Sequence, residues 1–285
     1  MKSFRISLYG NLILDKVYCV ERFAENESNA CVSKSISLGG ITNVLCAITE
    51  LESKYKINIS SAIGTDTNGS FVNRWLSNYK KINSSTLDSV DINKNKTTSE
   101  AIIISDTKEK KRTSVVSWGA CAQRSDLPDF FSDWCHILYA DKLVNLNIEE
   151  LKKLSKSSII SIDLCSSNFS DHTRRKIINM LPYVDFVFAS YEEGICLSMK
   201  ENASKAAEWI AKRTRGVAVL HSPEGSFFCD KKYEKVYHHK VKEMLNGSIN
   251  VLGAGDIFAA SFIVSTLKEK SLADSIEFAH SNTSS

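Results

Sequence analysis

The sequence lacks long apolar runs, dense blocks of basic residues and closely spaced cysteine pairs. No apolar run approaches the roughly 20 residues that a transmembrane helix needs. The first residues lead straight into an apolar strand pattern, which is not the pattern of a signal peptide. No cluster of lysine and arginine resembles the footprint of a nucleic-acid-binding surface. We therefore expect neither a membrane nor a nucleic acid among the partners.

The eight cysteines are scattered, and none belongs to a Cys-x-x-Cys pair. This spacing gives no indication of a zinc site. Cys135 and Cys229 lie within apolar strand patterns, where a free thiol behaves as a small buried hydrophobe. A reduced, cytoplasmic protein is the simplest interpretation.

No Pro/Gly/Ser-rich linker and no internal repeat divides the 285 residues. Hydrophobic residues make up 43% and charged residues 24% of the chain, and the net charge is only +3. These values are ordinary for a globular protein. We expect residues 1–285 to form a single domain.

Short apolar strand patterns alternate with helical patterns along most of the chain. This alternation predicts repeated βαβ units, and hence a mostly parallel sheet covered by helices on both faces. Ligands of such folds bind beyond the carboxyl ends of the strands. The predicted strands cover residues 4–10, 58–63, 137–140, 159–164, 184–189 and 217–221, and the predicted helices cover 41–51, 70–79, 148–154, 171–181, 191–199, 203–214 and 274–279.

Two segments, residues 16–38 and 98–118, break this alternation. The first carries alternating strand-like residues. The second predicts a β-hairpin in which residues 101–104 return through residues 113–116, with a polar turn at 106–111. Such strands do not fit easily into a parallel sheet. We expect them to pair as a small separate sheet, a lid that excludes water from reacting groups.

The most informative segment is Gly253-Ala254-Gly255-Asp256, which precedes an apolar run. The glycines allow the backbone to approach a ligand closely. If a helix starts here, its free N–H groups and its dipole form an anion site beside Asp256. A carboxylate next to a bound phosphate suits a base that removes a proton from a hydroxyl. A structural alternative remains open, because acids are favoured in the first turn of any helix.

The chain resembles the ribokinase family of sugar and nucleoside kinases, also called PfkB-type carbohydrate kinases. The resemblance extends from Ile6 to about Ser281, and its most specific motif is the 253–256 segment. A second signature is Gly39-Gly40-Ile41-Thr42-Asn43 at the start of the first long helix. Supporting matches are Gly10, Asp15, residues 63–69, residues 111–113 and Asp163.

The resemblance implies a ribokinase-like three-layer α/β/α sandwich with a small β-sheet lid. It also implies transfer of the ATP γ-phosphoryl group to an alcohol, with Mg²⁺. Asp256 matches the catalytic base of the family. The N–H groups of Gly253, Ala254 and Gly255 match its anion hole. Phosphoryl transfer requires mainly positioning and charge stabilisation, which such a loop and Mg²⁺ supply.

Four further residues match the substrate site of the family: Asp15, Gly39, Gly40 and Asn43. Asp15 can accept hydrogen bonds from two sugar hydroxyls, and the Asn43 amide can both donate and accept. The two glycines let the ligand approach the backbone. The alternatives are that Asp15 is a surface turn residue and Asn43 an ordinary residue of a first helical turn.

The segment from His221 to Gly225, which includes Glu224, matches the region that flanks the nucleotide in the family. Glu193 matches an acid that organises Mg²⁺ through water. The asparagine that usually stands three residues before this acid is Ser190 here. A solvated helix face is the alternative interpretation for Glu193.

Three departures from the family pattern concern the site. Asn250-Val251 stands where the family usually has Asp-Thr, so activation by a monovalent cation is doubtful. Ile13 replaces an asparagine that contacts sugar in ribokinases, which argues against ribose as the substrate. The chain also ends at Ser285, earlier than its relatives usually do, which indicates either a shortened chain or an open nucleotide site.

We therefore expect an ATP-dependent kinase for a small sugar or sugar derivative. Residues 184–190 are similar to fructoselysine kinases, a subgroup of the family. The alternatives are a nucleoside kinase of the same fold and a non-catalytic descendant that binds a sugar or nucleotide. A homodimer formed through the lid is a further expectation.

Overall fold

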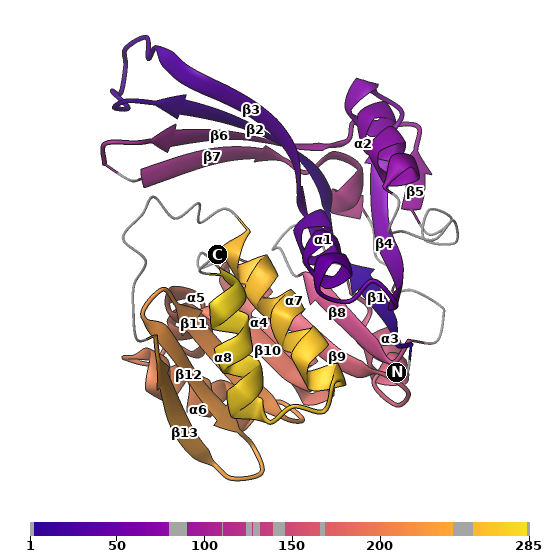
Figure 1. Cartoon of the computed structure of the whole chain (residues 1–285), viewed down its shortest axis with the longest axis vertical. Coiled ribbons are helices and arrows are strands. Elements are labelled where there is room, and N and C mark those ends of the chain that lie inside the picture. Colours follow the sequence, from indigo (N-terminus) through magenta and orange to yellow (C-terminus); the bar gives the residue numbers. More distant parts are fainter. Residues whose placement is uncertain are drawn as a thin grey trace.

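The computed structural model describes residues 3–79, 90–109, 111–123, 127, 132–138, 146–165, 169–241 and 253–283. Figure 1 shows one large sheet flanked by helices and a smaller sheet in the upper part of the molecule. The large sheet has the order β13-β12-β11-β10-β9-β8-β1-β4-β5. Its strands are β1 (Arg5–Tyr9), β4 (Lys56–Gly64), β5 (Val90–Asn93), β8 (Trp134–Leu138), β9 (Ile159–Asp163), β10 (Phe186–Ser190), β11 (Val217–Ser222), β12 (Gly225–Asp230) and β13 (Lys235–Lys240).

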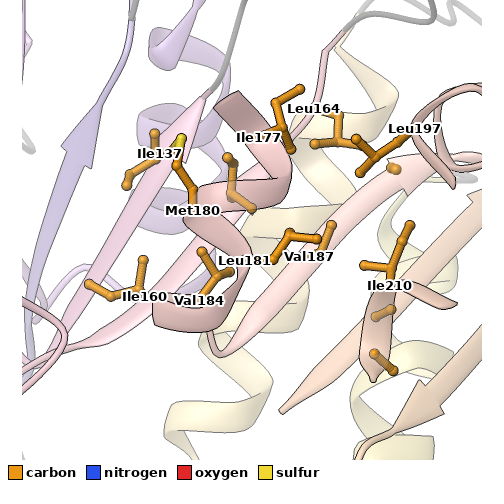
Figure 2. Packing of buried hydrophobic residues seen from close by; sticks show 14 of the residues in the cluster. Ile137, Ile160, Leu164, Ile177, Met180, Leu181, Val184, Val187, Leu197 and Ile210 are labelled. Atoms are coloured by element: carbon orange, nitrogen blue, oxygen red, sulfur yellow. The ribbon is translucent and has the colours of Figure 1, made fainter. Parts of the chain in front are cut away.

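Helices cover both faces of this sheet, as the alternating sequence pattern predicts. A core cluster lies between the sheet and one helical layer; Ile160, Ile177 and Met180 belong to it (Figure 2). On the opposite face, Ile6 and Leu8 of β1 pack against Leu45 and Ile263 in a second cluster. The first layer contains α3 (Ile148–Leu154), α4 (Asp171–Met180), α5 (Tyr191–Ser198) and α6 (Ala203–Ala211), and the second contains α1 (Ile41–Leu51), α2 (Thr67–Asn78), α7 (Ala254–Leu267) and α8 (Leu272–Thr283). The three-layer architecture is confirmed.

Two parts of the sheet differ from the sequence prediction. The strands β12 and β13 pair antiparallel at one edge, whereas the sequence indicated a turn after β11 and an apolar strand pattern around Cys229 but not this pairing. The strand β8 starts at Trp134, whereas the predicted strand starts at residue 137 and extends to residue 140, outside the described residues. The sequence places Cys135 in an apolar strand pattern, but the predicted strand starts only after the polar His136. Its buried ring is accommodated because Nδ1 lies 2.8 Å from the Ser161 hydroxyl of the neighbouring strand.

The smaller sheet has the order β3-β2-β6-β7 and is called the lid sheet below. It consists of β2 (Leu12–Val20), β3 (Cys31–Gly40), β6 (Ser99–Asp106) and β7 (Lys111–Ser117). The predicted hairpin is confirmed, since β6 and β7 pair antiparallel. The lid sheet lies on the side of the large sheet from which α1 and α7 begin (Figure 1).

The helix α2 also contacts the lid sheet. Asn68 of α2 donates a 2.7 Å hydrogen bond to the Glu100 carboxylate on β6, and Lys16 on β2 forms an ion pair with the same carboxylate.

No helix in the described part of the chain is both long and apolar enough to cross a membrane. All eight cysteines are free thiols.

Candidate active site

The helix α7 begins at a glycine in a left-handed conformation. Gly253 has φ 80° and ψ 3°, and its carbonyl oxygen accepts the first helical hydrogen bond, from Ile257, at 2.9 Å. Gly253 is the N-cap residue and has no side chain that could accept a hydrogen bond from the N–H groups of the first turn. The N–H groups at this end, together with the helix dipole, therefore suit a negatively charged ligand. Asp256 is the acidic residue of this first turn, in a helix that has no other charged residue.

The first turn of α1 meets the first turn of α7, although 213 residues separate them in the sequence. The Asn43 amide donates a 2.8 Å hydrogen bond from Nδ2 to Asp256 Oδ2. Gly40 precedes α1 with a φ of 63°, and a Cβ there would overlap the carbonyl of Asn11. Ile41 also donates its N–H to that carbonyl at 2.9 Å. The backbone around Gly40 thus fixes where Asn43 points.

Asp15 comes from the lid sheet and is 94% buried, with an exposed fraction of 6%. It lies beside Gly39, where a Cβ would overlap its carboxylate. Burial raises the pKa of Asp15 to about 6, and the guanidinium of Arg112 on β7 partly offsets this effect. A surface turn, the structural alternative for Asp15, does not match this placement. A buried carboxylate with open hydrogen-bonding capacity suits ligand hydroxyl groups.

The carboxyl group of Asp256 has a pKa raised to about 6. Burial is the largest cause, and the nearby carboxylates of Asp15 and Glu193 raise the pKa further. The hydrogen bond from Asn43 stabilises the ionised form and so lowers the pKa. At neutral pH Asp256 is therefore ionised, yet it is a stronger base than an ordinary aspartate.

Glu193 lies at the start of α5, where it completes a capping box with Ser190. The Ser190 N–H donates to Glu193 Oε2 at 2.7 Å, and the Glu193 N–H donates to the Ser190 hydroxyl at 3.2 Å. Burial raises the pKa of Glu193. The side chain is therefore not on a solvated helix face, and the serine that replaces the expected asparagine has its own structural role.

Asp163 ends the central strand β9 and joins this acidic group. Burial raises its pKa well above the ordinary value, and the charges of Glu193 and Asp256 add to the effect. Its Oδ1 accepts a 3.2 Å hydrogen bond from the N–H of Cys165, which has a left-handed φ of 54°. Mutual repulsion of three carboxylates would be relieved by a bound cation.

This acidic group could hold Mg²⁺ only together with substrate phosphates and water. Within the described ranges, no group of three or more His, Cys, Asp or Glu side chains is arranged to enclose a metal ion. Mg²⁺ does not require such a cage, because it keeps several waters and binds one or two carboxylates together with substrate phosphates. Asp163 and Glu193 can supply these oxygens.

The predicted nucleotide-binding residues fall into two groups. His221, at the end of β11, stacks on Phe258 of α7 with ring centroids 4.8 Å apart, and it also lies next to Gly255. Glu224 instead accepts a 2.6 Å hydrogen bond from the Ser222 hydroxyl within the turn between β11 and β12. Gly225 begins β12. The structure thus brings His221 to the start of α7 and leaves Glu224 in its own turn.

Asn250 and Val251, which replace the usual Asp-Thr pair, lie outside the described residues. Two residues near the site were not among the predicted site residues. Asp163 could have been included, because an acid directly after a buried strand belongs at the carboxyl edge of the sheet. Arg112 belongs to the matched segment 111–113, but only the structure shows that its charge acts on Asp15.

Comparison with known protein families identifies a match over nearly the whole chain. Residues 3–283 match the family described as pfkB family carbohydrate kinase. The chain belongs to this family. The resemblance noted in the sequence is thereby confirmed over nearly the whole chain.

Solved structures show the same fold. The Arabidopsis thaliana ribokinase complexed with ribose and ATP has a TM-score of 0.76 at 18% identity, over 99% of this chain and 92% of that one. The Methanocaldococcus jannaschii nucleoside kinase has a TM-score of 0.75 at 21% identity, with the same coverage. At these identities the likeness establishes the fold alone.

One curated relative is similar over a shorter stretch. The Dictyostelium discoideum adenosine kinase is 28% identical over 116 residues, which is 37% of this chain. The match spans about a third, 34%, of the length of that relative.

Proposed function

We propose that this chain transfers the γ-phosphoryl group of ATP to a hydroxyl group of a sugar or nucleoside. Asp256 carries the proposal, because it stands beside the anion-binding start of α7 and has a pKa raised to about 6. The family to which the chain belongs supports this reaction. The ribokinase with bound ATP and the Cryptococcus neoformans ribokinase with ADP, both similar in fold, support ATP as the donor.

In the proposed mechanism, the substrate lies between Asp15 and Asp256. Asp15 accepts hydrogen bonds from its hydroxyl groups and orients it. Asn43 holds Oδ2 of Asp256, so that Oδ1 can take the proton of the attacking hydroxyl. The substrate oxygen forms a bond to the γ-phosphorus, and the bond between that phosphorus and the β–γ bridging oxygen breaks to release ADP.

The backbone N–H groups of Gly253, Ala254 and Gly255 stabilise the charge that develops on the transferred phosphoryl group. Mg²⁺, if bound, would neutralise charge on the phosphates. Asp163 and Glu193 are the residues proposed to hold it through its water ligands.

Release of ADP from ATP would be measured with a panel of sugars, amino sugars, glycated amines and nucleosides. Substitution Asp256→Asn is expected to lower kcat by about 10²–10⁴ for the substrate that is turned over. Asp274→Asn is the matched control. Asp274 also lies in a first helical turn, where it accepts a 2.7 Å hydrogen bond from the Ser271 hydroxyl, but it is exposed. Undiminished turnover by the Asp256→Asn variant would refute the mechanism.

A further inference from the structure

The helices α1 and α7 run side by side in the same direction, and a groove lies along them. Asn43 bonds to Asp256 where the two helices start. At their other ends, the Lys268 ammonium lies 3.2 Å from the Glu52 carboxylate. The groove between these two contacts has a volume of about 340 Å³, within the range that is typical of small-molecule sites. We call it the α1–α7 groove.

The α1–α7 groove starts at the candidate active site and leads away from it. Asn43 of α1 and Gly253 of α7 lie at its start. Glu50 and Ser261, which also line it, each lie about two turns further along their helix, or roughly 11 Å from the start. Glu50 and Ser261 are therefore at a similar level, at the end of the groove that is remote from the active site.

The hydroxyl group of Ser261 has no hydrogen-bond partner among the described residues, although its side chain is completely buried, with an exposed fraction of 0%. Ser265, one turn further along the same helix, differs because its hydroxyl accepts a 3.1 Å hydrogen bond from Ser275. Buried polar groups in folded proteins are nearly always hydrogen-bonded. Since Ser261 lines the groove, a ligand bound there can supply the partner of this hydroxyl.

The rest of the lining defines which ligands fit. Ala47, Leu51 and Ile257 are aliphatic, and Glu50 is the only charged residue among the described residues that line the groove. Glu50 would repel an anion, and a sugar would leave hydroxyl groups without partners against the aliphatic side chains. An ammonium group placed between Glu50 and Ser261 could instead donate hydrogen bonds to both of them. The apolar remainder of such a ligand would extend over Ile257 and be removed from water.

We infer that the α1–α7 groove is an effector site for a small amine with an apolar body. The ammonium group binds at Glu50 and Ser261, and the apolar end reaches Asn43 and Gly253. Asn43 holds the Asp256 carboxylate, and Gly253 is the residue at which α7 begins. The occupant thus contacts residues that position the candidate base and the anion-binding helix start, while Asp256 itself does not line the groove. The site does not depend on the proposed function.

Calorimetry on the full chain compares three probes. These are 4-phenylbutylamine, 4-phenylbutyrate, which has a similar shape and the opposite charge, and n-butylamine, which lacks the ring. We expect 4-phenylbutylamine to bind at least about tenfold more tightly than either of the others, because it combines apolar burial with the complementary charge. Equal affinities, a preference for the carboxylate, or no binding of 4-phenylbutylamine would overturn the inference.

Two substitutions locate the bound amine. Glu50→Gln should weaken binding of 4-phenylbutylamine about fivefold at low salt and less at high salt, because Glu50 is exposed and its charge is screened. Ser261→Ala should weaken it about fivefold through loss of the buried acceptor. The matched controls are Glu277→Gln and Ser265→Ala, at helical residues that do not line the groove. Binding that is unaffected by Glu50→Gln and Ser261→Ala, or is equally weakened by the controls, would place the amine elsewhere and refute the assignment.

Unfolding in urea without any probe tests whether the Ser261 hydroxyl is unpartnered. Ser261→Ala should leave the midpoint unchanged or raise it, whereas Ser265→Ala should lower it because a buried hydrogen bond is lost. A lower midpoint for Ser261→Ala would show that its hydroxyl already has a partner, which would remove the basis of the inference.

NMR tests the contact with the active site. The side-chain amide signal of Asn43, assigned as the one that is lost in Asn43→Ser, should shift when 4-phenylbutylamine saturates the wild-type protein. An unchanged signal at saturation would refute the contact with Asn43 and, with it, the role as an effector site.

Discussion

Replacement of Asp256 by asparagine is expected to stabilise the fold at neutral pH although it lowers kcat. The pKa of this carboxyl is raised from 3.8 to about 6, chiefly by burial and also by the charges of Asp15 and Glu193. Ionisation is therefore less favourable in the folded than in the unfolded chain. An uncharged amide avoids this penalty, and its oxygen can still accept the hydrogen bond from Asn43.

The difference of about 2 pKa units corresponds to about 3 kcal/mol, because each unit is worth about 1.4 kcal/mol. Asp256 is not completely shielded from solvent, so we expect a gain of about 1–3 kcal/mol in the free energy of unfolding. Below the unfolded pKa of 3.8, the carboxyl is neutral in both states and the gain vanishes. As the pH rises from 3.8 to about 6, ionisation of Asp256 becomes possible in the unfolded chain before the folded one, and the wild-type protein loses stability. Above about 6 the gain of the variant reaches its full size.

Urea unfolding of both proteins at several pH values between about 4 and 8 measures this gain. The exposed Asp274→Asn variant is the control and should show no comparable pH-dependent gain. A gain for Asp256→Asn that does not depend on pH would refute the electrostatic argument. A loss of stability at neutral pH would show that the carboxylate stabilises the fold.

Three further predictions concern the same region. The value of kcat/KM should rise as the pH rises through about 6, because Asp256 and Asp15 become ionised there; a flat rate profile across this range would contradict their raised pKa values. Gly253→Ala should lower the free energy of unfolding by about 1–2 kcal/mol because the backbone at this position is left-handed. It should also reduce ATP turnover because the new Cβ would lie 3.0 Å from Asn43 Nδ2. Unfolding and rate measurements on the same variant check both effects. Ser190→Ala should lower the free energy of unfolding in urea by about 1 kcal/mol through loss of the helix cap, and an unchanged midpoint would argue against the capping box.

Sequence periodicity was sufficient for most of the fold. The predicted helix of residues 41–51 coincides with α1, and the predicted hairpin coincides with the pairing of β6 and β7. These elements were predictable because their apolar periodicity is local. The antiparallel pairing of β12 with β13 was not predicted, since the burial of these strands depends on the neighbouring strand and helices and leaves a weaker pattern in the sequence.

The candidate site divides in the same way. The sequence by itself determined a glycine-flanked helix start with an acid in its first turn, because backbone freedom and helix polarity are properties of a short segment. Only the tertiary structure decided what surrounds Asp256. It brings Asn43 into hydrogen-bonding contact across 213 residues and places Asp15 and Glu193 near enough to raise the pKa of the base. Burial and charge proximity depend on how distant segments pack, and no local pattern encodes them.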